Sequence, residues 1–325
     1  MTRTPLLAGV VMAGLAGPAA AQDQALVDAL REAFRSEAAR SDLGNAFQSL
    51  TVFGATPGIS AATFHVDDGS GADLDLNAIK LSPSRSFHVG LGVRPYVEGT
   101  FGYLSAEQTI RVLEGVEDAT TAAVDIDAFT VLAGIGIEIP VARGTVIRPI
   151  GLIGYSRIED SAKIRGAFAE ELALAGGGIV FDVEIDSLLY GAALELEHAR
   201  SFEGGITFNG TVRYNQLFDE VLDASDPVLE SSGSFGVFTA GAEIDGPTGM
   251  TVFSRELRWI GFAANTYLPG EQNDALGFSF FFEIGAGIEL VDREVISGIE
   301  GISLRGSGII GDNVTGWTAG LSVEF

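Results

Sequence analysis

The chain has 325 residues, 44 acidic against 19 basic side chains, a formal net charge of −25 and no cysteine. The absence of cysteine excludes disulfides and thiolate metal sites, and the negative charge argues against nucleic-acid binding, which depends on Lys and Arg. The 43 glycines are roughly twice the usual share, which suits the bends and close backbone approaches of β-structure.

The first 21 residues have the pattern of a secretory signal peptide. Arg3 supplies a positive charge, Leu6 to Leu15 is a short apolar run, and Ala19-Ala20-Ala21 offers small residues for cleavage. The apolar run is shorter than the roughly 20 residues of a membrane-spanning helix. We therefore predict that residues 1–21 are a leader; the alternative is a buried N-terminal helix.

Residues 22–56 are predicted to form an amphipathic helix and a linker. Within Asp23–Arg40, apolar residues such as Leu26, Leu30 and Phe34 recur at helical spacing. Two placements are open for this helix. It is either an exposed periplasmic or capping helix, or it is lodged in the interior of a barrel.

Residues 57–325 are predicted to form an all-β fold, a transmembrane antiparallel β-barrel of about twelve strands. An even number of strands is usual in bacterial single-chain barrels. The dipeptide Arg148-Pro149 fits least well, because proline cannot donate to a β-ladder. The strand-like blocks are Ile59–Asp67, Ala72–Leu81, Phe87–Ser105, Val124–Pro140, Thr145–Ile158, Phe181–His198, Phe202–Asn215, Ser234–Asp245, Glu256–Leu268, Leu276–Leu290, Gly298–Ile310 and Gly316–Phe325.

The blocks alternate with the period of two that defines a β-strand. One face of each block is apolar and is predicted to contact lipid, while the other carries Glu, Thr, Asn, Arg and Gly. This pattern predicts a wet interior, which favours a membrane barrel over a soluble β-sandwich or lipocalin. The charged residues on the inner face are the predicted pore-lining residues: Glu138, Glu195, Glu197, Arg213, Glu283 and Glu289.

Aromatic residues near the block ends predict the belts that mark a membrane–water boundary. These residues are Tyr103, Tyr155, Phe202, Tyr214, Tyr267, Phe278 and Phe325. The stretches Leu113–Thr121, Glu159–Gly178 and Leu217–Ser232 are predicted to be long extracellular loops, and Asp245–Gly249 a tighter turn.

The residues that could carry chemistry are few. Ser86 lies two positions before His88 but lacks an orienting partner, and His65 lies close to Asp67-Asp68. Asp312-Asn313 matches no calcium-binding loop. We therefore expect no enzymatic activity, no cofactor and no metal site.

The final block alternates Trp317, Leu321, Val323 and Phe325 with small or polar residues. A last amphipathic strand that ends in Phe resembles the signal by which outer-membrane barrels are recognised during assembly. With the N-terminal helix and about twelve strands, residues 59–325 resemble the translocator of autotransporters, in the solitary form without a passenger. Residues 22–56 are too few to form a passenger.

The resemblance implies the outer membrane of a Gram-negative bacterium as the location. It also implies contact with outer-membrane lipid and lipopolysaccharide, and assembly by the barrel-assembly machinery with periplasmic chaperones. A monomer is expected, with no nucleic-acid partner.

Two functions remain open at this point. The first is a small porin-like channel, cation-preferring because of its acidic inner face and plugged by the N-terminal helix, or a purely structural barrel. The second is an adhesin-type surface protein that acts through the loops Glu159–Gly178 and Leu217–Ser232.

Overall fold

The computed structural model describes residues 19–41, 43–51, 61–66, 74–90, 92–113, 120–166, 168–270, 276–291 and 301–324, so most of the predicted leader lies outside them. The helices are α1 (Ala19–Ser41), α2 (Leu43–Ser49), α4 (Ala169–Gly176), η1 (Glu203–Gly205) and η2 (Pro227–Leu229). The strands are β1 (Ala61–Val66), β2 (Leu74–Leu81), β3 (Ser84–Ser86), β4 (Arg94–Leu113), β5 (Thr120–Ala142), β6 (Thr145–Arg165), β7 (Glu184–Ser201), β8 (Thr207–Ala224), β9 (Gly233–Val252), β10 (Arg255–Tyr267), β11 (Phe280–Val291), β12 (Gly301–Gly311) and β13 (Val314–Glu324). No described helix is long and apolar enough to span a membrane.

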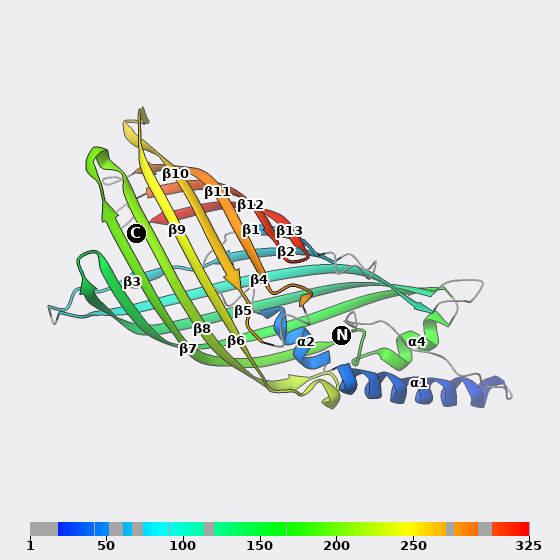
Figure 1. Ribbon diagram of the computed structural model, residues 1–325. Helices are drawn as coiled ribbons and strands as arrows, with labels where there is room; N and C mark the ends of the chain where they lie inside the picture. The colour runs from blue at the N-terminus through cyan, green and yellow to red at the C-terminus, as the bar shows by residue number, and fades with distance from the viewer. Residues whose placement is uncertain are drawn as a thin grey trace.

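Twelve of the strands close into one antiparallel barrel, seen from the side in Figure 1. Neighbouring strands pair in sequence order from β4 to β13, β13 pairs with β1, and β1 with β2; the ring closes where β2 pairs with β4. The extra strand, β3, lies beside β4 with Ser84 opposite Glu98, so it continues the line of β2 after a break at Pro83. The predicted fold class and strand number are confirmed.

The longest connections of the barrel lie at one end, and two of its two-residue turns lie at the other. At the end that we call the short-turn end, Arg143-Gly144 joins β5 to β6 and Phe253-Ser254 joins β9 to β10, and β13 ends there at Glu324. At the opposite end, the long-loop end, the connection after β6 contains α4 and the connection after β8 contains η2. Figure 1 shows the long-loop end on the right, with α1 and α4.

The outward face of the wall is apolar over a limited band, as β5 shows. Phe129 and Ile135 point outward and are 45% and 72% exposed. Toward the long-loop end the pattern inverts: Val124 and Ile126 point inward and are buried, and Asp125 points outward. The period of two continues through the inversion. Apolar side chains outside therefore mark the lipid-facing part of the strand, and polar ones mark the part in water.

Aromatic side chains on neighbouring strands are exposed at the level of this inversion. They are Tyr103, Phe129, Tyr155, Tyr190, Phe218, Tyr267 and Phe282. Of the predicted belt residues, Phe202 and Tyr214 are also exposed, whereas Phe325 lies outside the described residues. Phe278 was predicted wrongly. It precedes β11, so the strand period does not apply to it, and it is buried against Phe281.

The interior is not wet along its whole length, which corrects the prediction. In the long-loop half most inward side chains are apolar, although Asp160 and Asp219 are also buried there. The following apolar side chains are at most 5% exposed: Phe64, Leu76, Leu104, Ile158, Leu189, Leu217 and Phe281. They form one hydrophobic cluster with Leu43, Phe47 and Leu50 in and beside α2. The prediction failed because the apolar face of the N-terminal helices is buried here and requires apolar partners.

Several strands extend beyond their predicted ends. β6 continues to Arg165 and β8 to Ala224, so parts of the predicted loops Glu159–Gly178 and Leu217–Ser232 are strand. The predicted turn Asp245–Gly249 lies within β9. β5 alone has 23 residues, whereas roughly 9 to 11 residues span a membrane. The wall therefore projects past the lipid at the long-loop end.

Candidate functional site

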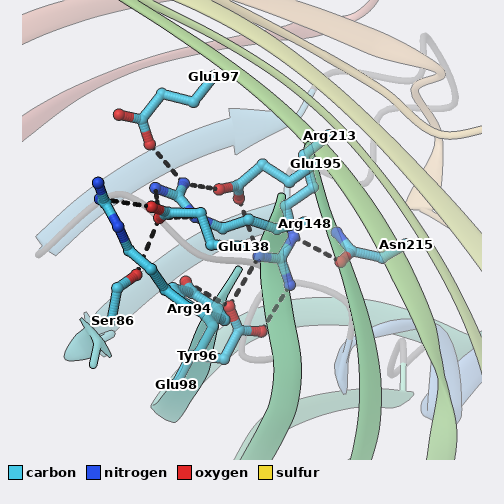
Figure 2. Close-up of polar contacts among 10 residues, drawn as sticks. All are labelled: Ser86, Arg94, Tyr96, Glu98, Glu138, Arg148, Glu195, Glu197, Arg213 and Asn215. Carbon is cyan, nitrogen blue, oxygen red and sulfur yellow. Dashed lines mark hydrogen bonds and ion pairs between the residues drawn. The ribbon is translucent and has the colours of Figure 1, made fainter. Parts of the chain in front are cut away.

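Charged side chains gather in the interior of the short-turn half, in a set that we call the interior cluster. It consists of Arg94 and Glu98 on β4, Glu138 on β5, Arg148 on β6, Glu195 and Glu197 on β7, and Arg213 on β8 (Figure 2). All occupy the inward positions of five consecutive strands, alternating with exposed neighbours such as Val97, Ile137 and Leu194. The predicted pore-lining residues on these strands are thus brought together.

Arg148 contacts more members of the cluster than any other arginine drawn in Figure 2. Its guanidinium donates to Glu138 Oε2 from Nε (2.9 Å) and Nη2 (2.6 Å), and from Nη1 to Glu195 Oε1 (2.6 Å) and to Glu197. It also lies over the Tyr96 ring, 5.2 Å from the ring centroid. One arginine therefore links β5 and β7 through charge-assisted hydrogen bonds.

Pro149 lies beside Arg148 and faces outward, where its missing N–H disturbs the backbone ladder. The β5–β6 ladder leaves two positions without a partner between Gly136 and Ile139. At one of these positions the side chains of Arg148 and Glu138 bind each other instead. At Arg148-Pro149, the dipeptide that fits the strand pattern least well, a side-chain ion pair therefore takes the place of backbone pairing.

Arg213 connects parts of the wall that are not neighbours. It reaches from β8 to Glu98 on β4, past three intervening strands, with Nη1–Oε2 and Nη2–Oε1 distances of 2.8 and 2.7 Å. It also donates to Glu195 Oε2 at 3.1 Å and to Asn215 Oδ1 at 2.8 Å. The Arg213 side chain is 3% exposed. This bidentate pair bridges the interior.

The glutamates of the interior cluster are paired rather than free. Glu138 accepts hydrogen bonds from Arg94 (2.9 Å), from Arg148 and from the Ser86 hydroxyl (2.9 Å). Three arginines face four glutamates, which leaves one net negative charge. The pairing of these arginines with the glutamates was not predicted. The alternation along one strand shows that a carboxylate points inward, but the arginine that binds it lies on a different strand.

The other two predicted pore-lining residues, Glu283 and Glu289, lie apart from the cluster on β11. Both are inward and are 8% and 7% exposed. Glu283 Oε1 accepts from the hydroxyls of Ser307 and Thr318, the latter at 3.2 Å. In the ring of twelve strands β11 lies across from β5, so these carboxylates are on the opposite wall.

The N-terminal helices cover the long-loop end. α1 lies along α4 and η2 (Figure 1) and buries Leu30, Phe34 and Ala38, which are one helical turn apart. The Phe34 ring packs edge-on against Phe181 with centroids 6.1 Å apart. α2 contacts β9 and η2, and Phe47 is buried in the apolar interior. The helix predicted at Asp23–Arg40 is therefore a cap, and α2 behind it is the inserted segment.

Two arginines fasten α1 to Asp226, the residue that caps η2; we call this contact the Asp226 latch. Arg35 donates to Asp226 Oδ2 from Nε (3.1 Å) and Nη2 (2.8 Å), and Arg31 Nη2 lies 3.6 Å from the same oxygen. Burial raises the pKa of Asp226, but hydrogen bonds from Arg35 and the Val228 N–H, and the charges of Arg35 and Arg31, lower it below its ordinary value.

The residues examined for catalysis have other contacts. The Ser86 hydroxyl donates to Glu138 in the interior, and His88 is exposed. His65 Nδ1 lies 2.8 Å from Asp75 on the outward face; Asp67-Asp68 lies outside the described residues. Within the part of the chain that the structure describes, no group of His, Asp and Glu is arranged to hold a metal ion.

The predicted assembly signal lies on β13. Trp317 and Leu321 face outward and are 58% and 63% exposed. The side chain of Val323 and the whole of Phe325 lie outside the described residues. Recognition by assembly machinery stays a prediction.

Comparisons with known proteins found similar solved structures but no family. No family model and no curated protein matches the sequence. One similar solved structure is the β-domain of the Bordetella autotransporter BrkA, with 14% identity over 82% of this chain and 98% of that chain and a TM-score of 0.46. Another is the translocator domain of NalP from Neisseria meningitidis, with 13% identity over 89% of this chain and 96% of that chain and a TM-score of 0.46. The transport unit of AIDA-I from Escherichia coli is also similar, with 13% identity over 82% of this chain and 88% of that chain and a TM-score of 0.48.

The fold assignment itself rests on the closed ring of paired strands. In lipid every backbone polar group has to be satisfied internally, which a closed barrel achieves. The ring, the outward apolar band and the exposed aromatic residues are those of a transmembrane β-barrel, which fits the outer membrane of a Gram-negative bacterium.

Proposed function

We propose that this protein is a small outer-membrane channel that is closed by its own N-terminal helices. The observation that carries the proposal is the covering of the long-loop end by α1 and α2, fastened by the Asp226 latch, a polar contact that water can replace. Behind the helices lie ionisable residues, which are costly inside a membrane and are a sign of function. An apolar interior would serve a purely structural barrel at least as well.

The orientation of the channel follows from its connections. Bacterial outer-membrane barrels have short periplasmic turns and longer extracellular loops. By this rule the short-turn end faces the periplasm, and α1, α4 and η2 lie at the cell surface. Release of α1 would then open the interior from outside.

We further propose that the open channel prefers cations. The interior cluster retains one net negative charge, and Glu283 and Glu289 add inward carboxylates on the opposite wall. Of the other inward cations, Lys80 on β2 interacts electrostatically with Glu283, and Arg258 and Arg305 are paired with Asp245 and Glu243. Acidic residues that line a narrow pore favour cations.

Single-channel recording in planar bilayers tests the closure by α1. Arg31→Gln combined with Arg35→Gln removes both charges that bind Asp226. We expect the unmodified protein to be mostly silent and the double variant to show discrete current steps, with an open probability raised roughly tenfold.

The matched control is Arg40→Gln, because Arg40 contacts only Glu37 and Ser36 of the same helix in the contacts that the structure describes. It should behave like the unmodified protein. A chain that starts at Thr56 removes both helices and is the stronger form of the test. Heat-shifted migration on gels shows whether each protein is folded. Folded but silent forms of both the double variant and the shortened chain would overturn the proposal.

A further inference from the structure

Three arginines at the short-turn end differ from the arginines of the interior cluster and of α1. Arg85 on β3, Arg143 in the β5–β6 turn and Arg200 at the end of β7 are exposed. None of them forms an ion pair with a carboxylate of the described residues, whereas the arginines of the interior cluster and α1 all do. Exposed Arg165 at the long-loop end also has no ion pair, so the position of these three beside the outer wall sets them apart, and water hydrates each guanidinium in the absence of an anion. We call these three residues the arginine rim.

Two members of the rim point toward lipid rather than into the interior. Arg85 lies opposite Val97, which belongs to the outward set of β4, and Arg200 follows the outward set of β7. Each guanidinium lies over an exposed aromatic ring: Arg85 is 5.8 Å from the centroid of Phe87, and Arg200 is 5.0 Å from that of Phe202. Arginine beside an aromatic ring at the edge of an apolar band is the composition of a membrane–headgroup boundary.

Arg143 and Arg200 form a single patch. The Ala199 N–H donates to the Gly144 carbonyl at 2.7 Å, so the β5–β6 turn lies against the end of β7. His198 is on the same outward face of β7, two residues before Arg200, and is half-buried. The contact therefore brings Arg200 and His198 of the outer wall next to the turn that contains Arg143.

We infer that the arginine rim binds the phosphate groups of anionic phospholipids in the leaflet at the short-turn end. A guanidinium matches the geometry of phosphate oxygens, and a basic group near an anionic membrane surface is attracted to it. Because Arg85 and Arg200 face outward, the partner of the rim is a lipid of the surrounding bilayer and not a solute in the interior. In the proposed orientation this is the periplasmic leaflet; the binding requires no channel activity.

The two tryptophans of the chain make the inference measurable. Trp259 on β10 faces outward and is 37% exposed. Its neighbour Arg258 donates to the Gly205 carbonyl at 2.7 Å, which places β10 beside the β7–β8 turn that follows Arg200. Trp317 lies nearer the long-loop end. Trp317→Phe therefore leaves one fluorophore close to the rim.

The experiment is quenching of Trp259 by brominated lipids. The full chain with Trp317→Phe is reconstituted in vesicles that mix phosphatidylcholine and phosphatidylglycerol, with bromine on one lipid or the other. We expect phosphatidylglycerol to occupy the sites around Trp259 about fivefold more readily, which corresponds to about 1 kcal/mol. Arg143→Gln with Arg200→Gln should bring this ratio close to one.

The matched control is Arg157→Gln. Arg157 is also outward and exposed, but it lies in the long-loop half and is paired with Glu159 and Glu184. The control should keep the preference, and all variants are checked for folding by heat-shifted migration. Equal quenching by the two lipids in the parent, or a preference that the double variant retains, would overturn the inference.

Discussion

Arg148 and Arg213 each bind carboxylates from more than one strand, which depends on the planar guanidinium group. The guanidinium presents five donors in a fixed geometry, whereas a lysine ammonium is a compact point charge. Both arginines are largely buried, with side-chain exposures of 11% and 3%. Removing one partner of a buried ion pair lowers the stability of a protein far more than replacing both partners by apolar side chains.

Replacement of Arg213 tests this argument at a single position. Arg213→Met leaves Glu98 buried without its bidentate partner, and we expect the free energy of unfolding to fall by about 3–5 kcal/mol. Adding Glu98→Met should recover most of the loss, since Glu195 keeps Arg148 as its partner. Urea unfolding in lipid vesicles, followed by tryptophan fluorescence, measures both. A double variant no more stable than the single one would contradict the cross-interior pair.

At the scale of elements, the twelve strands were predictable because the side-chain period persists along each strand. Their ends were not, because the apolar face changes sides at the membrane boundary. In β6 the predicted block ends at Ile158, but Lys163 outward and Ile164 inward continue the strand to Arg165 within what was predicted to be a polar loop. The Arg213–Glu98 pair could not be predicted, because it exists only once the ring has closed.

The Asp226 latch makes the docking of α1 dependent on pH. The pKa of Asp226 is lowered in the folded protein, so its contribution is complete above the ordinary value of about 4 and is lost as the pH falls through the folded value. A fluorophore on Ala39→Cys, an exposed site in a chain without cysteine, should lose anisotropy only below about pH 4.

Asp226→Asn separates the latch from other groups that titrate in acid. The variant should show low anisotropy at every pH, because the amide keeps the shape but not the charge. If the variant retained the acid transition of the parent, another group would be responsible for it.

At the scale of the whole molecule, the interior is close to charge balance and the outside is not. Selectivity should therefore depend on the inward carboxylates outside the interior cluster, Glu283 and Glu289 on β11. Glu283 Oε1 accepts hydrogen bonds from the hydroxyls of Ser307 and Thr318, and glutamine can accept the same hydrogen bonds.

Reversal potentials in a salt gradient measure this dependence. In the background that releases α1, Glu283→Gln with Glu289→Gln should lower the ratio of potassium to chloride permeability toward one. Glu107→Gln, an exposed outward substitution on β4, should leave the ratio unchanged. A ratio that the inward pair does not affect would remove these residues from the pore.

The position of α1 also constrains the order in which the molecule is assembled. The interior is bridged by Arg213 and Glu98 at one level and filled by apolar side chains at another, leaving no passage for a helix of about 10–12 Å diameter. An exported chain reaches the outer membrane from the periplasm, yet in the proposed orientation α1 lies at the cell surface. We therefore expect the helices to cross before β2 pairs with β4, so that closure of the ring makes the crossing irreversible.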